Sequence, residues 1–410
     1  FLYWIFIWYW FFLTGIHWIS HSLSFDENFK YIIPLSIIGL PLFLGLFFGF
    51  ANLLAGQFIK NNFTSILIFS SSFAFFDFLR SKILSGFPWN LWAYTWSSLP
   101  EVLQPLKFIG LFSFNLISIT FFCLPLLLIF KKKSNFILLS MFIFIFFSNY
   151  IYGSLTLNQN KDYIKTLNSK NISLNLKIIS PNLDLQYNLT DKDTERLVTD
   201  LIRYSDPQSN KKTIFIWPEG VFAGVNLQSI KNYTPLFKKN FSEDHLILFG
   251  INKKEINNGV ENIFNTLIVT NNNLDIIYEY KKRKLVPFGE FLPIENFFIK
   301  FGLKKITEGY GSFSNGAEQP LLNIDSFKIL TLICYEIIFP ELSKTIDEKN
   351  LIINISEDAW FGKSIGPYQH FSKAIFRAVE NDVFVARSAN KGISAFINNK
   401  GVIEKNLSHD

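Results

Sequence analysis

The stretch LTLICYEIIFPE, residues 330–341, decides the fold, because a continuous apolar run carries Cys334 to a Tyr-Glu pair. Short apolar runs of this kind are typical of strands that are buried on both faces of a sheet. In α/β enzymes, reactive groups gather beyond the carboxyl ends of such strands, and this is where Cys334 lies. A buried cysteine can also serve only as a small hydrophobic residue. The rest of the sequence must therefore decide between a nucleophile and a core residue.

The chain has only one other cysteine, Cys123, and it lies inside a hydrophobic stretch long enough to cross a bilayer. We therefore expect no disulfide between the two, and Cys334 should be a free thiol at the end of a strand. If the part of the chain that carries Cys334 lies outside the cytoplasm, such a free thiol is unusual, because cysteines of exported domains are usually paired or absent.

The composition indicates two units, one suited to a lipid bilayer and the other to water. Phenylalanine alone numbers 48 of 410 residues, and the first 153 or so residues carry few charges. From about Asn171 onward the charge density is that of an ordinary soluble domain. The net charge of +6 is modest, and no basic stripe with interleaved aromatic residues is present. This pattern argues against a nucleic-acid partner.

The first unit contains five segments long and apolar enough to span a bilayer. The lysine cluster 131–133 lies after the fourth segment, and the positive-inside rule places it in the cytoplasm. Arg80, Lys82 and Lys107 would then lie outside and oppose this orientation. The aromatic stretch GFPWNLWAYTWSSLP, residues 86–100, is either an interfacial anchor or part of an entrance for lipids. The expected spans are Phe1–Ser20, Tyr31–Leu54, Phe63–Leu79, Phe108–Phe130 and Phe136–Tyr152.

The expected domain boundaries are a helical membrane unit over 1–153, a linker over 154–171 and an outer unit over 172–410. In the outer unit, short apolar runs alternate with helical patterns, which predicts a layered α/β domain with a buried sheet. The predicted helices are Asp191–Tyr204 and Pro367–Asn381. The predicted strands are Leu174–Ile179, Thr213–Trp217, Leu246–Ile251, Asn265–Thr270, Ile329–Cys334 and Leu351–Ile355.

Three of the apolar runs end in reactive groups. The first ends in Trp-Pro-Glu-Gly, which places Glu219 just past a strand, and another ends at Cys334. The third, 277–280, continues into a basic run that includes Lys281, Lys282 and Lys284. A carboxylate could take the thiol proton, an ammonium group could stabilise an oxyanion, and the thiol could form a covalent acyl intermediate. The chemistry alone does not choose among the three lysines.

Several motifs together resemble the apolipoprotein N-acyltransferases, bacterial membrane enzymes whose outer domain belongs to the nitrilase (carbon–nitrogen hydrolase) superfamily. The resemblance covers nearly the whole chain. It implies a multi-helix transmembrane bundle joined to a nitrilase-like α-β-β-α sandwich. The matching stretches are GIHW (15–18), FLRSKILSGFPW (78–89), WPEG (217–220), LVPFGEFLP (285–293), ICYEI (333–337), SEDAWFGKSIGPYQH (356–370), RAVE (377–380) and ARSANKGISAFI (386–397).

The resemblance also implies roles for individual residues. The family's catalytic lysine lies eight residues before the glutamate of LVPFGE, which selects Lys282 before Glu290. The implied roles are then Glu219 as base, Lys282 as oxyanion stabiliser and Cys334 as nucleophile. The implied accessory positions are Glu290, Tyr335, Glu336, Trp360 as a pocket wall, and Tyr187.

The sequence departs from the family pattern at several points. The stretch PNLDLQYNL, 181–189, has Tyr187 near the place where the family often has tryptophan, and Glu357 stands where asparagine is usual. Trp360 could equally be a core aromatic. Relative to the family, we also expect the first membrane helices, the last outer strand and the final helix to be missing from this sequence.

The reaction implied by the resemblance is a ping-pong acyl transfer. A phospholipid acyl donor would form a thioester, and the α-amino group of a diacylglyceryl-modified apolipoprotein would accept the acyl chain. We expect a monomer in the bacterial inner membrane with several spans and a periplasmic catalytic domain. We expect no cofactor and no metal, because the five histidines show no ligand-like spacing. The alternatives are a membrane-tethered nitrilase-family amidase acting on a small amide, and a non-catalytic lipid-binding protein.

Overall fold

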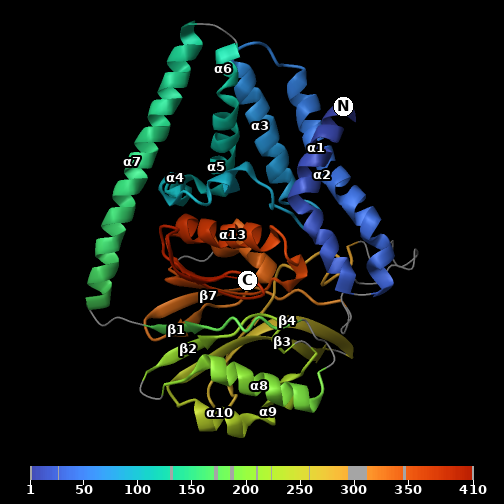
Figure 1. The fold of residues 1–410 in the computed structure, drawn as a ribbon, viewed down its shortest axis with the longest axis vertical. Coiled ribbons are helices and arrows are strands. Elements are labelled where there is room, and N and C mark those ends of the chain that lie inside the picture. Colours follow the sequence, from blue (N-terminus) through green and yellow to red (C-terminus); the bar gives the residue numbers. More distant parts are fainter. Residues whose placement is uncertain are drawn as a thin grey trace.

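A computed structural model of the chain describes residues 2–25, 27–129, 133–169, 174–184, 189–208, 211–222, 224–257, 259–293, 312–344 and 348–408. Its first part is a bundle of helices that stands on one side of two stacked sheets (Figure 1). Five helical segments in the described residues are long and apolar enough to cross a membrane, in agreement with the five expected spans. The long helices are α1 (Leu2–Ile16), α2 (Ile33–Gly56), α3 (Phe63–Arg80), α5 (Leu106–Cys123) and α7 (Lys133–Ser169). Shorter pieces are η1 (His17–Phe25), η2 (Glu27–Ile32), η3 (Trp92–Trp96), α4 (Pro100–Leu103) and α6 (Leu126–Ile129).

The first sheet has five strands in the order β1-β2-β3-β4-β5. Strands β1, β2 and β3 run parallel, and β4 and β5 complete the sheet antiparallel. The carboxyl ends of these parallel strands lie together at one edge of the sheet, where a residue that follows a strand can face the second sheet. The strands are β1 (Asn175–Ile178), β2 (Thr213–Ile216), β3 (His245–Asn257), β4 (Val260–Thr270) and β5 (Ile276–Lys281).

The second sheet has six strands in the order β11-β10-β9-β8-β7-β6. Its centre, β7-β8-β9, is parallel, and the other pairs are antiparallel. The strands are β6 (Leu322–Ile324), β7 (Phe327–Ile333), β8 (Leu351–Glu357), β9 (Phe384–Asn390), β10 (Ser394–Ile397) and β11 (Ile403–Leu407).

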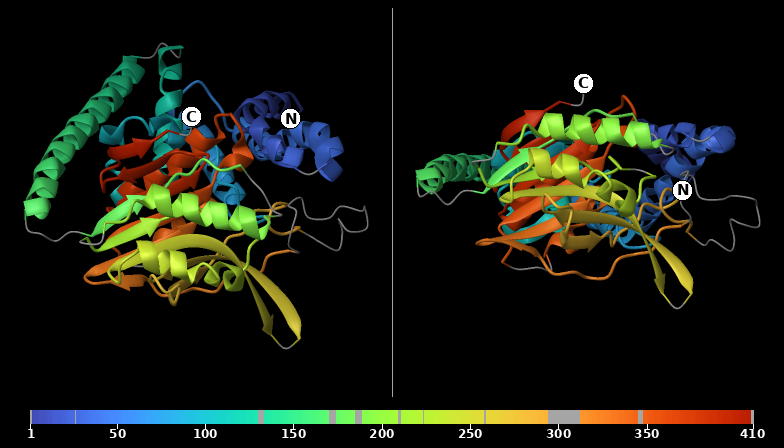
Figure 2. Two further views of the ribbon diagram at one scale, coloured as in Figure 1. Left: turned by 60° about the horizontal axis from the view of Figure 1, so that its bottom comes forward. Right: turned by 90° about the horizontal axis from the view of Figure 1, so that it is seen from below.

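Helices cover the outer face of each sheet and produce four layers, as expected for an α-β-β-α sandwich (Figures 1 and 2). On the first sheet lie α8 (Asp191–Ser205), α9 (Leu227–Lys231) and α10 (Thr234–Asn240), and on the second lies α13 (Gly366–Asn381). Helix α8 begins with a capping box between Thr190 and Asp193, which satisfies N–H groups that have no partner within the helix.

The central strands are apolar on both faces because each face has a neighbouring layer. Along β7, Leu330 and Leu332 point into the core shared with α13, whereas Ile329 and Ile333 point into the core between the sheets. This alternation follows from the two-residue period of a strand. It explains why β7 reads as a continuous hydrophobic run.

Helix α13 belongs to the sandwich and also packs against the membrane helices. Its Phe376 ring lies 4.8 Å from the ring of Tyr94 and 6.3 Å from that of Phe114 on α5. A single hydrophobic cluster extends from the membrane bundle through α13 into the second sheet. The outer unit is therefore docked on the bundle through a continuous core.

The structure adds to the sequence expectations in three places. Helix α7 continues to Ser169 and covers most of the stretch 154–171, which is expected to link the two units. Strands β6, β9, β10 and β11 and the short helices α9 and α10 were not predicted. The aromatic stretch 86–100 is not simply an interfacial anchor, because Trp89 is buried at 2 % exposure between the bundle and α13.

Candidate active site

Three loops that follow strands bring the predicted reactive residues to the junction of the two sheets. Glu219 comes three residues after β2, Lys282 directly follows β5, and Cys334 directly follows β7. All three side chains are buried, with residue exposures of 8 %, 1 % and 8 %.

Lys282 lies between two carboxylates. Its Nζ donates to Oε1 of Glu290 at 2.8 Å and to Oε1 of Glu219 at 3.3 Å. Burial alone would lower the pKa of Lys282, but the charges of Glu219 and Glu290 outweigh burial and raise it. The ammonium group therefore stays protonated, and because it has three N–H donors, one is left for a further acceptor.

The neighbouring Lys281 has a different environment, since successive side chains of a strand point to opposite faces. Its Nζ donates to Oε2 of Glu255 at 2.7 Å, and it lies 4.5 Å from the ring centre of Phe264. Lys282, not Lys281, thus faces the cluster that contains Glu219.

Glu219 is held by two further donors. Nδ2 of Asn265 donates to Oε1 of Glu219 at 2.8 Å and also to Oε1 of Glu290 at 2.7 Å. The backbone N–H of Glu357 donates to Oε2 of Glu219 at 3.0 Å. Oε2 keeps a lone pair that can accept a proton.

Cys334 has a left-handed backbone with φ of +50°, a conformation that is costly for a residue with a side chain. Burial raises the pKa of the Cys334 thiol, and the charge of Glu219 raises it further, against the opposing charge of Lys282. The resting form is therefore the thiol, and a nucleophilic thiolate requires a base that takes its proton. Glu219 is near enough for its charge to act on the thiol.

Behind Cys334 lies a buried cluster of Asp358, His370 and Arg387. Nη2 of Arg387 lies 2.8 Å from Oδ2 of Asp358 and 3.0 Å from Nδ1 of His370. Nε2 of His370 lies 3.3 Å from the carbonyl oxygen of Cys334 and fixes the strained turn. Burial lowers the pKa of His370 to about 4, and the charge of Arg387 acts in the same direction, so the ring is neutral at pH 7.

Cys334, Asp358 and His370 each offer a potential metal ligand, and these atoms lie within 4.8 Å of one another. The guanidinium group of Arg387 already contacts both Asp358 and His370, so a second cation at this place would meet a fixed positive charge. The donor set therefore fits an arginine-bridged support for the cysteine turn better than a metal centre.

The accessory positions have distinct environments. Glu290 also accepts from the backbone N–H of Val286 at 2.9 Å. Tyr335 donates to the carbonyl oxygen of Gly86 at 2.9 Å, which ties the cysteine turn to the membrane unit. The ring of Trp360 contacts Phe25 of η1, with ring centres 5.0 Å apart. Tyr187 lies outside the described residues.

Glu336 holds together the loops that carry Cys334 and Lys282. It accepts from Tyr280, from the backbone N–H groups of Arg283 and Lys284, and from that of Ile333, at 2.7 to 3.1 Å. Burial raises its pKa to about 7, although these N–H donors favour the charged form.

Sequence reasoning missed Asn265, Glu357, Asp358, His370 and Arg387 as parts of the site. Asp358 and His370 do lie in a motif that was singled out, but nothing in their spacing shows that β9 supplies Arg387 between them. Asn265 lies in β4, and the only sequence signal for it is an amide directly before the apolar end of that strand, where the structure buries it.

A thiol, a carboxylate with a free lone pair and an ammonium group with a free donor together suit acyl transfer through a covalent thioester. Two family models match the chain. The apolipoprotein N-acyltransferase N-terminal domain matches residues 1–124, and the carbon–nitrogen hydrolase domain matches residues 242–410.

Solved structures that match part of the chain include a cysteine-to-alanine mutant of an amidase of the nitrilase superfamily from Nesterenkonia. It has 16 % identity and a TM-score of 0.40, and the match covers 57 % of this chain and 86 % of the amidase. Nit3 of Saccharomyces cerevisiae has 15 % identity and a TM-score of 0.40, with coverage of 58 % and 86 %.

Curated relatives match almost the whole chain. The apolipoprotein N-acyltransferase of Rhizobium rhizogenes is 31 % identical over 400 residues, which cover 95 % of this chain and 74 % of that protein. The apolipoprotein N-acyltransferase of Rickettsia prowazekii is 33 % identical over 407 residues, with coverage of 97 % and 78 %. The chain therefore belongs to the apolipoprotein N-acyltransferase family, with a membrane-type N-terminal domain followed by a carbon–nitrogen hydrolase domain.

Proposed function

We propose that the chain transfers a fatty acyl group from a membrane phospholipid to the α-amino group of a diacylglyceryl-modified N-terminal cysteine, through a thioester on Cys334. The observation that carries this proposal is the position of Lys282. It is buried and bonded to both Glu219 and Glu290, and its charge acts on the Cys334 thiol.

In the first half-reaction, Oε2 of Glu219 takes the proton of Cys334 and the thiolate attacks the ester carbonyl carbon. The carbonyl oxygen becomes negative and is stabilised by the free N–H of Lys282 and by nearby backbone N–H groups. The ester C–O bond then breaks. The lysophospholipid leaves with the proton that Glu219 held, and the acyl group stays on sulfur.

In the second half-reaction, the amine of the acceptor attacks the thioester carbonyl, and Glu219 takes a proton from the attacking nitrogen. The C–S bond breaks, the thiolate recovers a proton, and an amide is released. Because the thioester must react with an amine and not with water, the site has to exclude solvent. The low exposure of Glu219, Lys282 and Cys334 supports this requirement.

The architecture supports a reaction at a bilayer surface. Both proposed substrates are anchored in the membrane, and Tyr335 ties the cysteine turn directly to Gly86 in the membrane unit. We place the membrane unit at 1–153 and the catalytic unit at 172–410. We propose that the chain works as a monomer in a bacterial inner membrane, with the catalytic unit in the periplasm.

The test is the intact mass of the purified protein after incubation with phospholipid in detergent micelles, with and without hydroxylamine. We expect a fatty-acyl increment that hydroxylamine removes and that is absent from Cys334→Ala. Transfer of this acyl group to a synthetic diacylglyceryl-cysteine peptide would complete the reaction. Hydrolysis of a small soluble amide without any acyl adduct would instead support a membrane-tethered amidase.

A further inference from the structure

Lys373 on α13 is a buried cation without an anionic partner. Five lysine and arginine side chains are buried among the described residues, and four of them form an ion pair with a carboxylate. Lys373 is 1 % exposed, yet it has neither a carboxylate nor a hydrogen-bond acceptor within the described part of the chain. The four paired cations and their partners are Arg80 with Asp77, Lys282 with Glu219 and Glu290, Arg377 with Glu380, and Arg387 with Asp358.

The contacts of Lys373 are aromatic. Its Nζ lies 4.2 Å from the ring centre of Tyr94 and 4.7 Å from that of Trp89. These cation–π contacts attract the ammonium group but leave its three N–H donors without an acceptor. A buried donor without an acceptor is costly, so a partner from outside the chain is expected.

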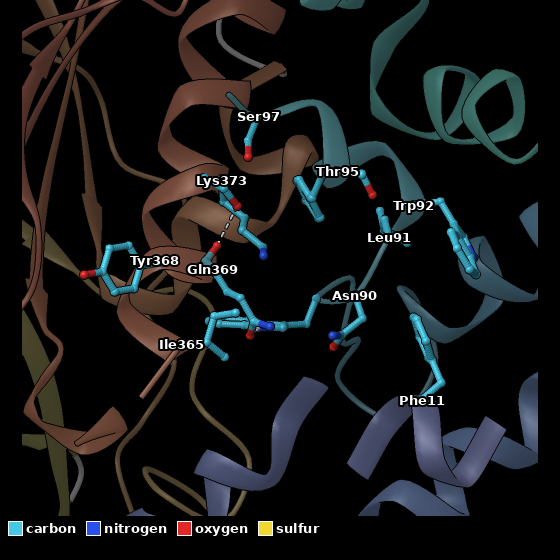
Figure 3. A pocket seen from close by; sticks show the side chains of 13 residues that line it. Phe11, Asn90, Leu91, Trp92, Thr95, Ser97, Ile365, Tyr368, Gln369 and Lys373 are labelled. Atoms are coloured by element: carbon cyan, nitrogen blue, oxygen red, sulfur yellow. Dashed lines mark hydrogen bonds between the residues drawn. The ribbon is translucent and has the colours of Figure 1, made fainter. Parts of the chain in front are cut away.

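Lys373 lines a cavity of about 340 Å³ between α1, the segment 89–97 and α13. Figure 3 shows its amino group pointing into the space between α13 and the segment that carries Asn90 and Thr95. A cavity of this size falls in the range of small-ligand sites. Phe11 and Ile365 contribute apolar side chains to its wall.

Other polar groups around the cavity also lack partners. The hydroxyl group of Tyr94 and the indole N–H of Trp92 are buried without a hydrogen-bond partner in the described residues. Together with Lys373 they offer donors and a positive charge, so a matching ligand must offer acceptor oxygens and a negative charge. Burial lowers the pKa of Lys373, and the charge of Arg80 acts in the same direction. A bound anion would oppose both effects.

We propose that this cavity binds the phosphate group of a membrane-lipid head group, with Lys373 as its counter-cation. The apolar wall and the position of the cavity favour a lipid over a free anion. Phe11 comes from α1, which is one of the segments able to span a membrane, and the cavity lies where the bundle meets the outer unit.

Trp89 lines the cavity and also contacts a residue that supports the candidate active site. The ring centre of Trp89 lies 5.5 Å from that of His370, which contacts the carbonyl oxygen of Cys334. This inference rests on the proposed function in one respect: the bound lipid would serve as an acyl donor only if the neighbouring Cys334 accepts an acyl group. Lipid binding itself requires no acyl transfer.

The test is therefore a binding measurement on the Cys334→Ala protein, which cannot form a thioester. Native mass spectrometry in detergent would compare phosphatidylglycerol with a diacylglycerol of the same acyl chains. We expect phosphatidylglycerol to bind roughly tenfold to a hundredfold more tightly, as a buried charge-assisted hydrogen bond predicts. Lys373→Met should abolish this preference. Lys405→Met, which removes an exposed lysine on β11, should retain it.

Tyr94→Phe provides a second variant that keeps the charge and the ring. It should weaken binding of phosphatidylglycerol by a few-fold without changing binding of diacylglycerol. Unchanged binding of phosphatidylglycerol to a folded Lys373→Met protein would overturn the proposal. So would Lys373-dependent binding of inorganic phosphate without any preference between the two lipids, because the ligand would then be a free anion. If acyl transfer failed but the Lys373-dependent preference held, only the proposed function would fall.

Discussion

Nζ of Lys282 donates to Oε1 of Glu290 at 2.8 Å, although the two residues lie in different parts of the loop that follows β5. The same ammonium group reaches Oε1 of Glu219 at 3.3 Å, and Nδ2 of Asn265 donates to the same oxygen atom of each carboxylate. The result is a buried network in which each charged group has a partner of opposite sign. Such networks hold geometry rigidly, because removal of one member leaves the others unpaired.

Lys282→Met should abolish formation of the thioester, whereas Lys281→Met should leave it nearly unchanged. Lys282 supplies the positive charge beside Cys334, and Lys281 pairs with Glu255 on the other face of the strand. We expect a loss of at least roughly a hundredfold for Lys282→Met, as for removal of other oxyanion donors. The measurement is the rate of hydroxylamine-sensitive acylation by intact mass. Equal losses in the two variants would show that Lys282 has no special role.

Asn265→Asp should shift the acid limb of the acylation rate to higher pH. The substitution places a third carboxylate next to Glu219 and Glu290, which disfavours the charged form of each. Since the proposed base must be ionised to take the thiol proton, activity should then require a higher pH. Asn265→Leu, which removes the amide without adding charge, should lower the rate by roughly tenfold without this shift. An unchanged pH profile in Asn265→Asp would argue against Glu219 as the base.

The strands that carry Glu219 and Cys334 could be predicted from sequence because both are apolar on two faces. In β2, Phe215 enters the core beneath α8, whereas Ile214 and Ile216 enter the core between the sheets. A strand that is covered on both sides reads as a continuous hydrophobic run. The end of that run marks the sheet edge, where reactive groups are expected.

Strand β9 escaped prediction because three of its buried residues, Arg387, Ser388 and Asn390, are polar and interrupt the apolar pattern. Arg387 and Ser388 are fully buried, but each has a partner from another element, Asp358 for Arg387 and the carbonyl oxygen of Ile179 for Ser388. A pattern of hydrophobicity does not reveal such long-range pairing. For the same reason, the position of His370 between Asp358 and Cys334 was not predictable from spacing.

The choice between Lys281 and Lys282 illustrates a second limit of prediction from the sequence. Both belong to one basic run, and the two-residue period of a strand sends them to opposite faces. The residues alone do not state which face meets Glu219; resemblance to a family made that choice. The structure places Lys282 within hydrogen-bond distance of Glu219 and Lys281 with Glu255.

His370→Asn should make the folded protein less sensitive to acid. The pKa of His370 is about 4 in the folded protein because burial and Arg387 disfavour its charged form, compared with about 6.5 when unfolded. Between these values only the unfolded chain takes up the proton, so stability falls as pH decreases from 6.5 to 4. This difference corresponds to about 3 kcal/mol of unfolding free energy.

The measurement is the unfolding temperature in detergent between pH 7 and pH 4. The wild-type protein should lose more stability over this range than His370→Asn, and the exposed His17→Asn variant should behave as the wild type. Parallel pH curves for wild type and His370→Asn would contradict a neutral, buried His370.

Glu357→Gln should preserve both folding and acylation. Burial raises the pKa of Glu357 well above its usual range, and the nearby charge of Glu219 acts in the same direction, so the carboxyl group is expected to be protonated at pH 7. Nδ2 of Asn390 donates to both carboxyl oxygens, at 3.1 and 2.9 Å. Glutamine has the shape and neutrality of a protonated glutamate and can keep an acceptor toward Asn390. We expect acylation rates within about threefold of wild type and a stability change within about 0.5 kcal/mol.

The matched variant is Gly220→Ala, because Gly220 packs against the side chain of Glu357. A Cβ at Gly220 would lie 2.9 Å from Oε2 of Glu357, and the backbone there has φ of +78°. This variant should disturb the turn that carries Glu219 and reduce acylation by roughly tenfold or more, because a left-handed conformation is costly for alanine. Combining Gly220→Ala with Glu357→Ala would remove the contact but not the backbone strain, so it should restore only part of the rate. If Glu357→Gln instead lost activity as severely as Gly220→Ala, Glu357 would have to be charged. The cluster around Glu219 would then contain an additional negative charge.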